Sequence, residues 1–261
     1  MRTSSTIAEV LTQFLAEQEP RLSARTFARY ENVAQLLQHY LNGYAYEGLD
    51  ERAMKHFERL YRAKGDAHRE FCEIFGPEYI LPNIDMFLND FMIRKVGGGQ
   101  DLMRAAGTVT KKLAFWLAEH GHIEASTTEV AVEVGAAAVR DLPKTRALLT
   151  RLQALTERFT AHREVEAILE AGPLLHPEAL RRVGGEPPPQ TAEEVEDHFW
   201  IRRIEASAIW LQGTIDGREL GPIPLPQDIV ALCTVGWTIA GVVGRVGNDW
   251  QLVDVWNVYP S

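Results

Sequence analysis

Positively charged side chains recur at helical spacing in three sets along the chain. The first set, repeating every four residues, is Arg21, Arg25 and Arg29. The second set, spaced by three, four and three residues, is Arg52, Lys55, Arg59 and Arg62. The third set is Arg104, Lys111 and Lys112. Residues three or four apart share a helix face, so each set predicts a row of cations able to follow a phosphate backbone of duplex DNA. The alternative is an exposed face, which Glu51 and Glu58 would partly balance in the second set.

Metal and catalytic sites have weaker candidates. His120 and His122 could chelate a metal only with a third and fourth ligand, and histidines beside Gly121 at a helix end more often cap free carbonyls. The segment 66–73 is dense in ligand types, but on a helix they point to several faces. The glycines at 97–99 lack the residues of a phosphate loop. We expect no catalytic residue, no metal and no cofactor, unless a deep polar pocket contains His68 or the His120–His122 pair.

Tryptophan is concentrated in the last part of the chain, at positions 200, 210, 237, 250 and 256. Aromatic side chains fill a small core efficiently, and this is the simpler interpretation. One or two on a shared face could instead form a groove for a peptide or for stacked bases. We therefore name Trp237, Trp250 and Trp256 as candidates for contact with a partner.

The charge balance limits the partners of the protein. The chain of 261 residues has a formal net charge of −9, and the excess of acidic residues falls after residue 122. This excludes a generic nucleic-acid coat but leaves the first half able to present a basic face. No apolar run approaches the length of about 18 residues that spans a bilayer, so we expect a cytoplasmic protein without membrane contact. Cys72 and Cys233 lie in apolar stretches and are expected to be buried free thiols.

The periodicity predicts an all-helical first part, residues 1–123. Apolar spacing indicates two helices within 7–41, broken at Glu19-Pro20, with Ser23 capping the second and Asn42-Gly43 ending it. Further helices are predicted at 50–64, from there through 75, at 84–96 and at 101–120, the last with a possible break near Gly107.

Residues 124–197 are predicted to be a connector. Helices are expected at 124–139 and 148–159, and the leucines of the second could pack within the chain or across a homo-oligomer. The run 173–189, with five prolines, predicts a linker, and the acidic run 193–197 a solvated segment.

From residue 198 to 261 the pattern becomes strand-like. Asp216-Gly217 predicts a type I′ hairpin turn, and residues 247–249 predict a second turn. Four or five strands in about 60 residues favour a small closed β-barrel, since closure removes exposed edges. The predicted fold class is therefore multidomain, with an all-α bundle, a helical connector and a small C-terminal β-barrel.

The helical part also resembles a known family. The segment 26–30, Thr-Phe-Ala-Arg-Tyr, resembles the opening helix of the core-binding domain of tyrosine recombinases and phage integrases. Residues 107–117 and the closing 121–123 are similar to the final helix of that domain. The resemblance implies a helical bundle that clasps duplex DNA. It does not extend to recombination, because the only His-x-x-Arg match is His56 to Arg59 in the bundle and Tyr259 is expected in a strand end. The segment 235–259 resembles a Src-homology-3-like barrel.

Two functions follow from these patterns. The first is a non-enzymatic DNA-binding protein whose bundle contacts duplex DNA and whose C-terminal domain contacts a protein partner. The alternative is a protein–protein adaptor without a nucleic-acid role, which the overall acidity favours. Steep loss of affinity with added salt would separate the two.

Overall fold

The first two helices form as their caps dictate. In the computed structural model, which describes residues 5–170 and 191–261, helix α1 is Ile7–Gln18, and Thr6 and Glu9 cap it reciprocally. The break at Glu19-Pro20 is confirmed as the short 3-10 turn η1, Glu19–Arg21, and the Ser23 side chain accepts the Thr26 N–H at the start of α2, Ala24–Tyr44. Helix α2 does not end at Asn42-Gly43 as expected. The Asn42 side chain accepts the Cys72 N–H at 2.9 Å, so it serves a tertiary contact rather than a helix end.

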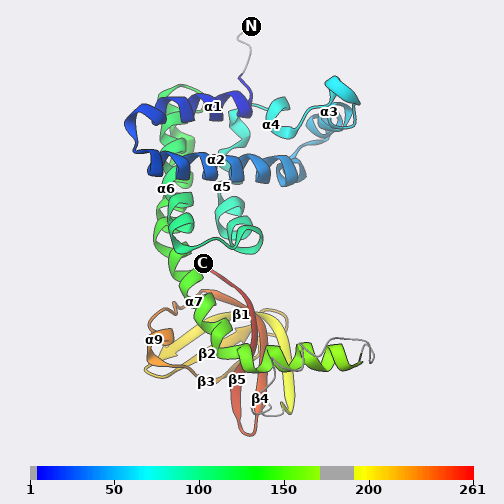
Figure 1. Cartoon of the computed structure of the whole chain (residues 1–261), viewed down its shortest axis with the longest axis vertical. Helices are drawn as coiled ribbons and strands as arrows, with labels where there is room; N and C mark the ends of the chain where they lie inside the picture. Colours follow the sequence, from blue (N-terminus) through cyan, green and yellow to red (C-terminus); the bar gives the residue numbers. More distant parts are fainter. Residues whose placement is uncertain (1–4, 171–190) are drawn as a thin grey trace. The chain divides into compact units, whose positions relative to one another are not determined.

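Shorter elements follow α2. They are η2 (Ala45–Gly48), α3 (Glu51–Tyr61), η3 (Gly65–Ala67), α4 (Phe71–Ile74), η4 (Pro77–Tyr79), η5 (Leu81–Asn83) and α5 (Ile84–Met86). The expected helix reaching residue 75 is reduced to α4, because Gly65 takes a positive φ of 58° and Glu70 begins a new capping box. The expected helix 84–96 consists of α5 and a π-helix, η6, Phe87–Val96. Figure 1 shows these elements around α2.

Helices α6 and α7 run side by side (Figure 1). Helix α6, Gln100–Glu119, is not broken at Gly107, because this glycine lies against the backbone of α7. After η7, Ala125–Thr127, helix α7 runs from Thr128–Glu170 and joins the two helices expected at 124–139 and 148–159. Pro143 lies inside α7, where it removes one backbone hydrogen bond. The linker expected at 173–189 lies outside the described residues.

The chain divides into two compact units, Met1–Pro143 and Lys144–Ser261, which we call the helical unit and the sheet unit. The helical unit has an aromatic core in which Phe14, Phe71 and Phe87 are fully buried. Phe14 packs edge-on against Trp116 of α6, and the Ile7 N–H donates to the Phe75 carbonyl after α4. None of the helices described in residues 5–170 and 191–261 is both long and apolar enough to cross a lipid bilayer.

The sheet unit contains five antiparallel strands in the order β3-β2-β1-β4-β5. Their bounds are β1 Glu193–Glu205, β2 Ala208–Gly213, β3 Glu219–Pro224, β4 Thr238–Val246 and β5 Asp249–Tyr259, with a short helix α9, Gln227–Val230, before β4. The acidic run 193–197 is the first part of β1 rather than a segment before the strands, and its Glu194 and Glu196 side chains are exposed. Glu193 pairs with Arg218 across the sheet.

The sheet is not closed into a barrel, which corrects the expected C-terminal fold. Edge strand β3 carries Pro222 and Pro224, which have no N–H to donate to a neighbouring strand. Helix α7 instead covers the apolar face, since Leu148 and Leu152 belong to the same buried core as the strands. Gln153 of α7 donates to the Val255 carbonyl of edge strand β5 at 3.2 Å. The leucines of α7 are thus buried within the chain, and the helix protects the open side of the sheet.

The two expected turns are both present, but one has a different geometry. Strands β2 and β3 pair across a loop in which Gly217 has a φ of 69°, while no non-glycine residue in the described chain has a positive φ. Asp216 therefore does not adopt type I′ geometry. The loop is held by the buried Asp197, whose carboxylate accepts from the Thr214 hydroxyl at 2.7 Å and the Ile215 N–H at 3.0 Å.

Candidate functional site

The cations of α2 and its preceding turn are only partly available to a ligand. Arg29 forms an ion pair with Asp101 of α6 at 2.8 Å, whereas Arg21 and Arg25 are exposed. The pair joins the first half of α2 to the beginning of α6. In the first set of cations, Arg29 is thus engaged in an ion pair within the protein.

The cations of α3 are largely balanced along their own helix. Lys55 pairs with Glu51 at 2.5 Å, and Arg62 pairs with Glu58 at 3.0 Å. Arg59 contacts the His56 ring at 3.2 Å, so the His-x-x-Arg match is a contact within one helix. Arg52, at the start of the helix, is exposed. Lys55 and Arg62 therefore fit the alternative for this set, an exposed face whose charge is balanced by glutamates.

The three sets of cations are not gathered on one element. Arg104 and Lys112 are exposed on α6, while the backbone and Cβ of Lys111 lie against Gly135 of α7. Figure 1 shows α6 beside the N-terminal half of α2 and α3 beyond its C-terminal end. At 1.5 Å per residue, the 21 residues of α2 separate these regions by roughly 30 Å.

The tryptophans of the sheet unit differ widely in burial, and only Trp237 of the five is fully in the core. Trp237 is 2% exposed, so it is not accessible to a partner, and Trp250 packs against the core under Arg218. Trp256 is 40% exposed and donates to Asp254 at 2.9 Å. Trp200, which we did not name for partner contact, is 44% exposed. Its outward position follows from strand alternation, because Phe199 and Ile201 on either side are buried.

The histidine candidates have separate surroundings. His68 lies between the Tyr61 carbonyl and Glu70, and its pKa is raised by these hydrogen bonds. The His120 ring lies 2.9 Å from the Trp116 carbonyl at the end of α6, as the capping alternative expects for this one of the two histidines. In the described part of the chain, no group of three or more His, Cys, Asp or Glu is placed to hold a metal ion.

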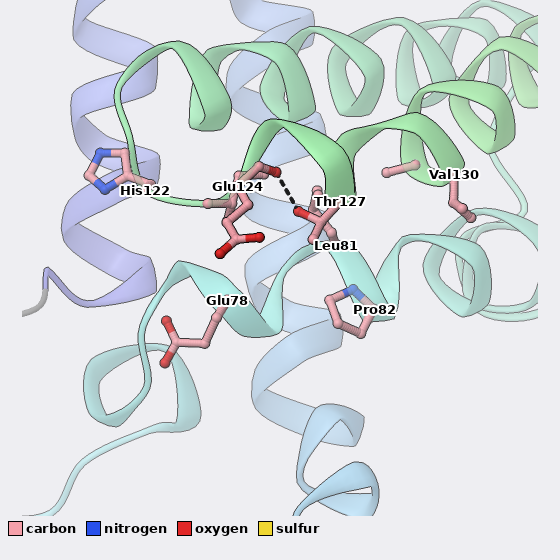
Figure 2. Close-up of a pocket in the computed structure, with 9 residues that line it drawn as sticks. Glu78, Leu81, Pro82, His122, Glu124, Thr127 and Val130 are labelled. Carbon is pink, nitrogen blue, oxygen red and sulfur yellow. Dashed lines mark hydrogen bonds between the residues drawn. The ribbon is translucent and has the colours of Figure 1, made fainter.

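His122 lines a pocket of the helical unit, a cavity of about 490 Å³ between the segment after α4 and the beginning of α7 (Figure 2). Its apolar lining is Leu81, Pro82, Ile123, Val130 and Ala131. The volume is in the range of sites for small ligands or for single side chains of a partner. We call this cavity the groove.

The apolar surface of the groove is open to solvent. Val130 is 70% exposed although it stands on a helix, and Pro82 is also exposed. Covering the exposed valine and proline with another apolar group removes apolar surface from water, which is favourable. In Figure 2 these two residues lie at the end of the groove opposite His122. This end can therefore accept an apolar side chain.

The polar end of the groove carries two carboxylates from opposite walls. Glu78 comes from η4 and Glu124 from the segment before η7, and Figure 2 shows both on the His122 side. The Glu78 carboxylate folds over Gly76, where a Cβ would lie 2.3 Å from Oε2, so a side chain at position 76 would displace it. The groove thus combines an apolar half with an anionic half.

His122 itself is held in a neutral form near neutral pH. Burial, followed by the nearby charge of His120, lowers the pKa of His122 below its ordinary value. His120 in turn contacts Glu17 at 3.2 Å, and Glu17 also accepts the Trp116 indole N–H at 2.9 Å. The negative charge of Glu78 and Glu124 is therefore not cancelled by His122 at neutral pH.

The sequence patterns did not identify this groove. Val130 belongs to a stretch rich in alanine and valine that reads as an ordinary connector helix, and the two glutamates are 46 positions apart. The only signal was His122, which the sequence placed at a helix end. No family model, curated protein or solved structure matches the chain, so the resemblance to the core-binding domain stays an expectation.

Proposed function

We propose that the protein is a non-enzymatic adaptor that binds a short segment of a partner protein in the groove. The segment carries an apolar side chain, which packs on Val130 and Pro82, next to a lysine or arginine, which contacts Glu78 and Glu124. The observation that supports this most strongly is the exposed apolar wall facing two carboxylates in one cavity. The proposal makes the adaptor function that was the alternative in the sequence analysis more specific.

The expected affinity is modest. Burying one leucine-sized side chain contributes about 2 kcal/mol, and each exposed ion pair contributes about 0.2–1 kcal/mol. With both ion pairs the sum is about 2.4–4 kcal/mol, which corresponds to a Kd of about 1 mM or weaker for this contact alone. A useful interaction therefore needs further contacts along the segment or several copies of it.

The groove offers binding groups rather than reactive ones. Thr127, its only hydroxyl, donates to the Glu124 carbonyl oxygen at 2.7 Å within the same turn (Figure 2). Among the described contacts, no serine or threonine hydroxyl and no cysteine thiol is hydrogen-bonded to His122. A general base without a neighbouring nucleophilic side chain does not suggest a reaction class.

The adaptor is better supported than duplex-DNA binding. Arg29, Lys55 and Arg62 are engaged by carboxylates, and the chain has a net charge of −9. Phosphate contacts require free cations gathered on one surface. If DNA were the partner, a labelled duplex would bind at low salt and lose affinity steeply as salt is added.

A peptide-display selection tests the proposal. Random peptides are selected on the full-length protein, and the enriched peptides are then tested on Val130→Glu, which places an acid in the apolar half. Val235→Glu is the matched control, because Val235 is 56% exposed and belongs to the sheet unit, which contributes no residue to the groove. We expect enriched peptides with an apolar residue beside Lys or Arg that bind wild type and V235E but not V130E. Peptides without a basic residue, or with equal binding to V130E, would contradict the proposal.

A further inference from the structure

A second cavity in the helical unit lies between the end of α2 and the π-helix η6. It has a volume of about 450 Å³ and is lined by residues of α2, η2, η5, α5 and η6. It shares no lining residue with the groove. The two sites are therefore chemically and structurally separate.

Three aromatic rings form one wall of this cavity. The ring centroids of Tyr40 and Tyr44 are 5.7 Å apart, and Phe91 lies 5.4 Å from Tyr40 and 5.9 Å from Tyr44. Tyr40 is buried, whereas Tyr44 is 36% exposed. Met86, 53% exposed, adds a soft apolar group at the rim. The wall thus presents π-faces and edges to whatever enters.

Carboxylates surround the aromatic wall. Glu47 of η2 and Asp90 of η6 line the cavity, and Asp85 of α5 is close enough to act on the same tyrosine. Burial, and then the charges of Asp90, Glu47 and Asp85, raise the pKa of Tyr40 to about 12. Three carboxylates from three elements thus act on Tyr40, which stays protonated at neutral pH.

Two cationic residues, Arg94 and Lys95, also line the cavity. The Arg94 guanidinium pairs with Asp90 at 2.8 Å, one turn along η6. Lys95, the next residue, is exposed. Glu47 is exposed and has no ion pair among the described residues, so it is the carboxylate free to meet a ligand.

The π-helix is itself informative. The whole of η6, Phe87–Val96, has π-helical hydrogen bonding and ends at Gly97 with a φ of 56°. π-helical turns are rare and frequently occur at functional sites, because the wider turn moves side chains out of α-helical register. Asp90, Phe91 and Arg94 of η6 all line this cavity.

We propose that this cavity binds a small organic ammonium cation. Aromatic rings attract ammonium groups through their quadrupole, and the attraction grows when the cation loses water. Glu47 supplies the opposite charge, and the methyl or methylene groups of the cation pack on Tyr44 and Met86. A neutral molecule of the same shape would gain the packing but not the electrostatic part.

Choline and its neutral isostere 3,3-dimethylbutan-1-ol test this directly on the full-length protein. Methyl-labelled methionine gives an NMR signal for Met86, assigned with Met86→Leu, and ionic strength is kept constant with sodium chloride. We expect choline to shift the Met86 methyl resonance saturably in the millimolar range, while the isostere binds about fivefold more weakly or not at all.

Variants at exposed positions identify the contributing groups. Glu47→Gln should weaken choline binding about fivefold, and Tyr44→Leu, which keeps an apolar surface, should also weaken it. Glu119→Gln, exposed on α6, is the matched control and should bind as wild type. The proposal is overturned if choline causes no saturable shift, if the isostere binds equally well, or if Glu47→Gln leaves the affinity unchanged.

Discussion

Gly107 of α6 and Gly135 of α7 face each other where the two helices meet. A Cβ on Gly107 would lie 2.6 Å from the Val139 amide nitrogen and 2.7 Å from the Gly135 carbonyl oxygen. These contacts are with backbone, which cannot move aside as a flexible side chain can. The close approach fixes the first part of α7, including Val130 and Ala131 of the groove.

Gly107→Ala should therefore destabilise the helical unit, by about 1–3 kcal/mol, because the added methyl forces α6 and α7 apart. The matched control is Gly43→Ala in α2, where nothing lies within 4 Å of the new Cβ. This control should stabilise the helix by about 0.5–1 kcal/mol. Urea unfolding of both variants measures the difference, and equal stability of G107A and wild type would show that the helices are not in contact at this point.

Asp197 should stabilise the sheet unit in a pH-dependent manner. Burial raises the pKa of Asp197, but hydrogen bonds from Thr214, Ile215 and His198 outweigh it, so the net pKa lies below its ordinary value. A carboxylate with a lowered folded pKa stabilises fully above its unfolded pKa of about 4, and this contribution is lost as the pH falls through the folded value.

Asp197→Asn should accordingly cost about 1–3 kcal/mol at pH 7, because an amide nitrogen cannot accept from these donors. The difference from wild type should shrink below about pH 4. Asp254→Asn, which alters only an exposed contact with Trp256, is the control. Denaturant midpoints from pH 3 to 7 test the prediction. A stability difference between wild type and Asp197→Asn that grows on acidification would contradict it.

The two cysteines should be unreactive in the folded protein. Both are buried free thiols, and burial first of all raises the pKa of Cys72 to about 12 and that of Cys233 to about 11. The thiolate is the reactive form, so its fraction at neutral pH is small. Labelling with Ellman's reagent should detect both thiols only after denaturation. Rapid labelling of the native protein would mean that one of the two sites opens readily.

Histidine titrations should separate His122 from His68. His122 is expected to titrate below the ordinary histidine pKa because of burial and His120, and His68 above it because of Glu70 and the Tyr61 carbonyl. Peptide affinity in the groove should fall on acidification as His122 becomes cationic beside Glu78 and Glu124. NMR titration of both rings, with His68→Gln and His122→Gln for assignment, checks the order of the two midpoints.

The sequence predicted the helices best where caps and breaks are local. Ser23 and the Glu19-Pro20 break act on their own neighbours, and the structure confirms the break and the start of α2. Helix α2 extends past Asn42 to Tyr44, and the Asn42 side chain bonds to Cys72, 30 positions away, a contact that no local pattern contains.

The open sheet and the groove depend on contacts between distant residues. The periodicity of α7 indicated a helix with an apolar stripe, but not that Leu148 and Leu152 would cover a sheet beginning more than 40 positions later. Likewise, Glu78 and Glu124 line one cavity only because η4 and the segment before η7 form two of its walls. Cation spacing predicted faces of single helices, and it could not show that Asp101 would pair with Arg29.

In the proposed adaptor, the carboxylates of the groove select a basic residue. Isothermal titration calorimetry tests this selection with four pairs: wild type and Glu78→Lys/Glu124→Lys, each with one selected peptide and with its Lys-to-Glu counterpart. Charge reversal on either side alone should weaken binding about tenfold, and reversal on both sides should restore it. Equal affinity across all four combinations would contradict the claim and leave only apolar packing in the groove.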